Sequence, residues 1–289
     1  MPVITKTKTT GVPPKPKKES NSLLSQAEDL VFDEGIGLKI ALYGRAGTGK
    51  TTLASTFPGK ILYITCSGGA NTIGELRSVY TREVRQKMKR INIESSIQLG
   101  QLADELAQDD SYSSAVLDTA TNFQHLILKE ILELDELPPQ LSWGIATQQQ
   151  WGQCSLQTQE YLRKLLNIPK NVIVIAQERE YDPTLENGEA IMPYVGPALT
   201  PKAAGWLNAA VDYLGQTFIR KKTEIVTNKV NGKEVKTKKT LDEFEYCLRV
   251  GPHDMFITKF RIPKNTQTAI VNPTYDKIIK MLLEGGAVV

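Results

Sequence analysis

The sequence predicts an α/β fold with a mainly parallel central sheet, followed by a β-rich C-terminal extension. Four short apolar runs, each ending at glycine or polar residues, are typical of buried strands; they cover 38–43, 61–66, 114–117 and 171–176. Segments with helical features separate them, and strands that alternate with helices form parallel sheets. The last third carries β-prone runs on both sides of Asn231 and Gly232, a pair that favours a tight hairpin turn.

The other predicted elements come from local signals of the same kind. Leu126, Ile127 and Ile131 recur at helical spacing, and Pro58 ends the helix that begins near Lys50. Helices are predicted at about 50–57, 72–90, 96–107, 121–134, 149–166 and 273–284. Further strands are predicted at 213–220, 241–250 and 255–261, and loops at 135–148 and 181–198, the second with room for a hairpin.

The length and composition fit one large domain with a flexible arm. The chain has 289 residues, 40% of them hydrophobic, which allows a sizeable core. Lysine, threonine and proline dominate the first twenty residues, so we predict a basic flexible arm over 1–35, either a solvated tail or a contact to nucleic acid or a partner. A single domain is predicted over 36–289, with a β-hairpin insertion at about 220–240.

Several classes of protein are disfavoured by what the sequence contains. The three cysteines are scattered without a C-x-x-C pair, which argues against a disulfide framework or a zinc site and fits a reducing cytoplasm. No run of eighteen apolar residues occurs, so no membrane span is expected. The N-terminus has lysines but lacks the apolar segment of a secretory signal. We therefore expect a cytoplasmic protein that does not contact a membrane.

The strongest motif is a phosphate-binding loop between the first strand and the first helix. Residues 44–51 match G-x-x-x-x-G-K-[ST] in full. Glycines let backbone N–H groups wrap a phosphate, and the helix N-terminus adds partial positive charge. The lysine reaches the terminal phosphates and the threonine hydroxyl ligates Mg²⁺. The predicted residues for binding ATP with Mg²⁺ are Gly44, Arg45, Ala46, Gly47, Thr48, Gly49, Lys50, Thr51 and Thr52.

Two further polar residues end buried strands. Asp118 follows 114–117, where open α/β sheets place their ligands, and its carboxylate is predicted to hold Mg²⁺ with Thr51. The other interpretation is a plain helix N-cap, formed by Asp118 or Thr119. Gln177 follows 171–176, and its amide is predicted to sense the γ-phosphate; a polar residue that simply faces solvent is the alternative.

Together these segments resemble the RecA-like ATPases, and more closely the phage ATPases of the single-strand-annealing and recombination type. The resemblance covers about residues 36–265. It rests on KIALYGRAGTGKTTLASTFPGK, AVLDT, QQQWGQ, NVIVIAQERE and the triplet Lys259-Phe260-Arg261. It implies a RecA-like P-loop NTPase fold and a protein that assembles on single-stranded DNA and promotes annealing or strand exchange, with ATP as the assembly switch.

The resemblance also implies roles for single residues. Gln177 would couple nucleotide state to DNA binding. The loop at about 181–198 would match the second DNA-binding loop of these ATPases, and the segment at about 135–150 the first. Lys259 and Arg261 would reach the nucleotide of a neighbouring subunit in a ring or filament. By itself, the triplet is also compatible with an exposed strand that carries an inward phenylalanine.

One position departs from the family pattern. These ATPases carry a glutamate after the second strand, which orients the attacking water, and here Ser67 stands in that place. Glu75 and Glu178 lie elsewhere in the chain. The sequence therefore predicts binding more firmly than hydrolysis, and two alternatives stay open: a non-hydrolysing nucleotide-dependent DNA-binding oligomer, and a P-loop motor or helicase loader.

The predicted hairpin is the most basic part of the chain. Between 220 and 239 it has eight lysines and arginines against Glu224 and Glu234. One interpretation is contact with the phosphate backbone of single-stranded DNA, without sequence preference. The other is an edge hairpin whose lysines prevent aggregation.

Overall fold

The structure is a computed structural model that describes residues 37–66, 82–135, 137, 146–182, 185–186, 189–190, 192–230, 233–260 and 268–283. These residues all belong to one compact unit, Gly35–Val289. The predicted arm at 1–35 lies outside the described residues, as do Ser67 and Arg261. Predictions about those positions stay predictions.

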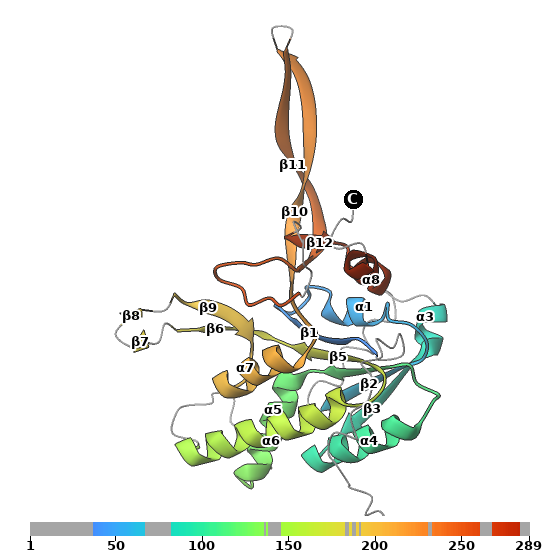
Figure 1. Ribbon diagram of the computed structural model, residues 1–289, viewed down its shortest axis with the longest axis vertical. Coiled ribbons are helices and arrows are strands. Elements are labelled where there is room, and N and C mark those ends of the chain that lie inside the picture. The colour runs from blue at the N-terminus through green and yellow to red at the C-terminus, as the bar shows by residue number, and fades with distance from the viewer. Residues whose placement is uncertain are drawn as a thin grey trace, which may run out of the picture. The chain divides into compact units, whose positions relative to one another are not determined.

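An eight-stranded sheet forms the centre of this unit (Figure 1). Its strands lie in the order β12-β11-β10-β1-β5-β4-β2-β3. They are β1 Lys39–Tyr43, β2 Ile61–Cys66, β3 Met88–Ile93, β4 Ser114–Asp118, β5 Asn171–Ala176, β10 Tyr213–Val230, β11 Lys233–Arg249 and β12 Ala269–Val271. The strands from β10 to β3 pair in parallel, and β11 and β12 add antiparallel pairs at one edge. The predicted α/β class and the β-rich extension are confirmed.

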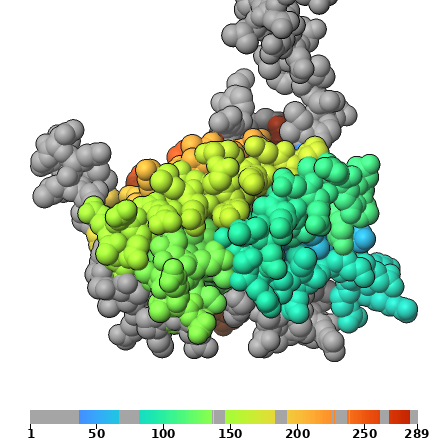
Figure 2. Space-filling model, turned by 90° about the horizontal axis from the view of Figure 1, so that it is seen from below, coloured from blue at the N-terminus to red at the C-terminus, as the bar shows by residue number. Residues whose placement is uncertain are grey.

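Helices cover both faces of the sheet (Figure 1). They are α1 Lys50–Ala54, α3 Arg82–Lys87, α4 Ser96–Gln108, α5 Ala120–Ile131, α6 Gln148–Leu166, α7 Pro201–Ala210 and α8 Tyr275–Leu283. Figure 2 shows α4, α5 and α6 side by side on one of these faces. Within the described ranges, none of the helices combines the length and the apolar content needed to cross a membrane.

Alternation along β1 divides the interior into two cores. Ala41 and Tyr43 pack in the core that contains side chains of α4 to α7, and Ile40 and Leu42 pack in the core shared with α1 and α8. Successive side chains of a strand point to opposite faces, so a strand covered on both sides is apolar throughout. This is why the central strands are continuous apolar runs in the sequence. Packing on both faces also fixes the ends of β1, β4 and β5, which the site residues follow.

The strands β10 and β11 form a long hairpin that extends beyond the sheet (Figure 1). Only Tyr213–Gln216 of β10 pairs with β1, and the remainder of β10 pairs with β11 alone. The pairing continues to Val230 and Lys233, with an irregularity between Lys221 and Thr223. The predicted hairpin is confirmed, and its turn at 231–232 lies outside the described residues.

Two predictions about secondary structure are wrong, and one helix was missed. The residues 88–90 were predicted as helix but begin β3, an edge strand with mixed polar and apolar residues that lacks a buried strand's signature. The helix α7 was missed, although Thr200 and Pro201 give it a typical start. The segment 255–260, predicted as part of a strand, forms only two isolated β-bridges. Phe256 pairs with Val195 and Lys259 pairs with Leu214, and neither bridge extends into a ladder.

Candidate nucleotide-binding site

The loop at 44–49 connects β1 to α1 and has the backbone that its glycines allow. Gly44, Gly47 and Gly49 all have positive φ angles, of 153°, 79° and 87°. A Cβ atom on Gly44 would lie 2.4 Å from the carbonyl oxygen of Thr217, so packing excludes any side chain there. A Cβ atom on Gly47 would meet no atom within 4 Å. The loop therefore packs closely on its β10 side and is open at its middle, where a phosphate would lie.

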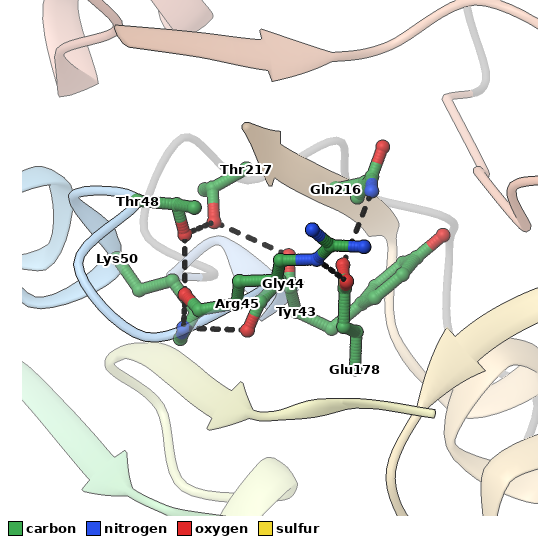
Figure 3. A network of polar contacts seen from close by, with 8 residues as sticks. All are labelled: Tyr43, Gly44, Arg45, Thr48, Lys50, Glu178, Gln216 and Thr217. Atoms are coloured by element: carbon green, nitrogen blue, oxygen red, sulfur yellow. Dashed lines mark hydrogen bonds and ion pairs between the residues drawn. The ribbon is translucent and has the colours of Figure 1, made fainter. Parts of the chain in front are cut away.

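The ammonium group of Lys50 lies inside this loop (Figure 3). Its Nζ atom donates to the carbonyl oxygens of Gly44 and Arg45, each at 2.7 Å. Burial lowers the pKa of Lys50, and the carboxylates of Asp118 and Glu178 oppose that shift. A buried cation held by two neutral carbonyls beside open space fits a site for an anion.

Thr51 and Asp118 meet at the other side of the loop. The Thr51 hydroxyl donates to Oδ2 of Asp118 at 2.9 Å. Burial raises the pKa of Asp118, while the bond from Thr51 and the charge of Lys50 lower it. A hydroxyl and a carboxylate in contact are the hard oxygen ligands that Mg²⁺ prefers. This donor set fits the predicted metal site, and the metal role stays a prediction. The N-cap of α5 is Thr119, one of the two residues that the N-cap interpretation named, and Asp118 is not the cap.

Hydroxyl groups join the loop to β10. The Thr48 Oγ1 atom lies 2.8 Å from the Arg45 carbonyl oxygen and 2.7 Å from Oγ1 of Thr217 (Figure 3). Thr217 also reaches the carbonyl oxygen of Tyr43 at 3.3 Å. The side chains of Ala46 and Thr52, also predicted to bind nucleotide, are exposed on the loop and on α1. The phosphate-binding loop is thus braced by the strand that continues into the basic hairpin.

A second polar network lies beside the loop. Arg45 Nε and Glu178 Oε1 form an ion pair of 2.8 Å, and Gln216 Nε2 donates to Glu178 Oε2 at 3.3 Å (Figure 3). Arg249 Nε donates in turn to Gln216 Oε1 at 3.0 Å. Sequence reasoning set Glu178 aside and missed Gln216 and Arg249. The sequence offered a pointer to Glu178, because this residue comes shortly after a buried apolar strand. No sequence pattern pointed to its partners Gln216 and Arg249 on β10 and β11.

Gln177 lies at the same edge of the sheet as the loop and Asp118. It follows β5, which pairs with β1 on one side and β4 on the other. Its backbone N–H donates to Oγ1 of Thr121 at 3.1 Å, and its side chain is exposed. The position suits a γ-phosphate sensor, and that role stays a prediction. The strand β6, Glu178–Tyr181, leads into the loop predicted at 181–198 and pairs antiparallel with β9, Tyr194–Pro197, inside that loop. Two short strands, β7 Leu185–Glu186 and β8 Glu189–Ala190, also lie in the loop and pair with each other.

Lys259 is placed at the C-terminal end of α7. Its Nζ atom donates to the carbonyl oxygens of Asn208, Ala209 and Val211 at 2.8, 2.9 and 2.6 Å. A cation there satisfies carbonyls that the helix leaves free and complements the helix dipole. This contact gives Lys259 a structural role within its own chain. The predicted reach of Lys259 and Arg261 toward a neighbouring subunit stays a prediction, and Arg261 lies outside the described residues.

Comparison with known proteins agrees with this geometry. A family model described as an AAA domain matches residues 36–262, most of the chain. No protein with a curated description matches the chain. The chain therefore belongs to the AAA domain family of P-loop ATPases, which confirms the predicted nucleotide-binding ATPase class. Phosphate-binding loops of this class take a nucleotide and, typically, Mg²⁺.

Proposed function

We propose that this AAA-domain ATPase assembles on single-stranded DNA and promotes annealing or strand exchange, with ATP as the switch for assembly. One observation supports the proposal most directly: the strand that braces the phosphate-binding loop through Thr217 continues into the basic hairpin. A change at the nucleotide can thus reach a charged surface through one strand. ATP bound at Lys50, with Mg²⁺ at Thr51 and Asp118, would supply that change.

The charge of the hairpin is divided between its root and its outer part. Near the root, Lys221 pairs with Asp242 at 3.2 Å and Lys222 with Glu243 at 2.9 Å. Arg220 pairs with Glu245 at 3.0 Å. The outer part holds five further lysines against Glu224 and Glu234, and these lysines are Lys229, Lys233, Lys236, Lys238 and Lys239. The unbalanced positive charge therefore belongs to the outer part, which favours contact with the phosphate backbone.

Replacing three outer lysines should weaken DNA binding in a salt-dependent way. We expect K233Q/K236Q/K238Q to flatten the slope of log K against log salt for single-stranded DNA by about 2, since each lost phosphate contact removes about 0.7. The measurement is fluorescence anisotropy with labelled oligonucleotides of several sequences, over a series of salt concentrations. ATP affinity should be unchanged.

The matched control is K221Q/K222Q, which removes two lysines whose charges the opposite strand balances. We expect a much smaller change in the slope for this variant. Equal slopes for the wild type and the outer variant would indicate that the lysines only protect an edge hairpin, and the DNA part of the proposal would be withdrawn.

Subunit mixing tests whether active sites are shared between subunits. We expect Arg261→Ala to retain ATP binding and to lose most turnover, because a cationic finger stabilises charge in the transition state. Asp118→Ala should lose turnover through the metal. Mixed oligomers of the two variants should recover part of the activity, measured as phosphate release with single-stranded DNA present. Absence of recovery would contradict a shared site.

A further inference from the structure

Glu178 is a carboxylate held at the end of the loop where the terminal phosphate would lie. Lys50 donates to the carbonyl oxygens of Gly44 and Arg45, and the side chain of that same Arg45 pairs with Glu178. The lysine of such a loop contacts the β- and γ-phosphates. The carboxylate of Glu178 is close enough to influence the pKa of Lys50. The ammonium group and this carboxylate therefore converge on the first two residues of the loop.

The two side chains of the ion pair between Arg45 and Glu178 differ in their exposure to solvent. The Arg45 side chain is 85% exposed, whereas that of Glu178 is 18% exposed. The second oxygen of Glu178 accepts from Gln216, a buried residue that is itself held by Arg249. An exposed ion pair contributes little free energy, so Arg45 can leave at small cost, while Gln216 keeps the carboxylate in place.

A terminal phosphate offers Arg45 a better partner than Glu178 does. It carries more negative charge than a carboxylate, and guanidinium groups bind phosphate in a bidentate manner. The exchange would leave Glu178 with one oxygen free beside the phosphate. Asp118, the other carboxylate that acts on Lys50, already bonds Thr51 on the metal side.

We propose that Glu178 accepts the proton of the water that attacks the γ-phosphate, and that Arg45 occupies this carboxylate until ATP draws the arginine to the phosphate. The inference rests on the proposed ATPase function. The water oxygen forms a bond to the γ-phosphorus, and the bond from that phosphorus to the β–γ bridging oxygen breaks, which leaves ADP. One water proton passes to Glu178 and then to solvent. Gln216 and Arg249 act as positioning residues.

The test compares E178Q, R45A and a control, E180Q, which changes an exposed glutamate two residues further along β6. We expect E178Q to lower phosphate release by about 100-fold, the usual contribution of a general base, with affinity for ATPγS and ADP within about twofold of wild type. R45A should bind ATPγS about tenfold more weakly and leave ADP binding unchanged, because its guanidinium would contact only the terminal phosphate. E180Q should match the wild type in all three measurements.

Chemical rescue separates a proton acceptor from a structural residue. Formate added to E178A should restore part of the turnover and leave E178Q unchanged, because only the shorter side chain leaves space for a small carboxylate. Wild-type turnover in E178Q would overturn the inference, as would equal weakening of ATPγS and ADP by R45A. Absence of phosphate release from the wild type, with and without DNA, would overturn it too. Each of these results leaves the DNA-binding proposal standing, which fails only if the hairpin lysines have no effect.

Discussion

Replacing Lys50 with alanine is expected to weaken ATP and ADP binding by about 100-fold. The nucleotide phosphates would lose two charge-assisted hydrogen bonds from the ammonium group, each of about 1.5 kcal/mol. The ammonium group is buried, and its hydrogen bonds go to the neutral carbonyl oxygens of Gly44 and Arg45, which do not neutralise its charge. A phosphate would give it a charged partner. Calorimetric titration of ATP and ADP, with and without Mg²⁺, measures the effect.

The control for this variant is Lys60→Ala, which removes a lysine that stacks on the Tyr112 ring, 4.3 Å from its centroid, outside the loop. Its nucleotide affinity should equal that of the wild type. Circular dichroism should show the same fold for all three proteins. If Lys50→Ala bound ATP as tightly as Lys60→Ala does, the loop would not be the nucleotide site, and the roles given to Asp118, Gln177 and Glu178 would lose their basis.

The phosphate-binding loop could be predicted because its structure depends on residues that are adjacent in the sequence. The loop from Gly44 to Thr51 lies on a continuous stretch, so its strand, turn and helix are all visible in the residues. Asp118 was predictable for a related reason: carboxyl ends of parallel strands meet at one edge, and a polar residue that ends a buried strand lies there. The contact between Thr51 and Asp118 bears this out, although the two residues are far apart in sequence.

The network around Glu178 could not be predicted because it depends on which strand lies beside β1. Thr217 reaches the loop and Gln216 reaches Glu178 only because β10 pairs with β1 in parallel, at a register that places Gln216 opposite Tyr43. Arg249 depends on the pairing of β11 with β10, again by register. Hydrophobic patterns show that a segment is a strand, but they do not show its neighbours. Lys259 illustrates the same limit, since its partners belong to a helix that the sequence did not reveal.

Replacing Asp118 with asparagine is expected to lower turnover by at least about 100-fold, since a bound metal supplies several kcal/mol of charge stabilisation to phosphoryl transfer. Asparagine keeps an oxygen that can accept the bond from Thr51, but it removes the negative charge that would hold Mg²⁺. The Mg²⁺ concentration at half-maximal activity should rise strongly. Phosphate release at increasing Mg²⁺ measures both effects, with Asp104→Asn, on the exposed side of α4, as the control.

The raised pKa of Asp118 lets experiment distinguish a loss of Mg²⁺ binding in this variant from a loss of folding. Burial favours the protonated form, so Mg²⁺ must compete with a proton, and its affinity should fall with decreasing pH sooner than for an ordinary aspartate. A carboxyl whose pKa is higher in the folded state than in the unfolded state lowers stability as the pH rises through those values. Without Mg²⁺ at neutral pH, Asp118→Asn should therefore unfold at the same temperature as the wild type or at a higher one. A lower unfolding temperature together with an unchanged Mg²⁺ requirement would make Asp118 a structural residue, and the metal would then need another ligand.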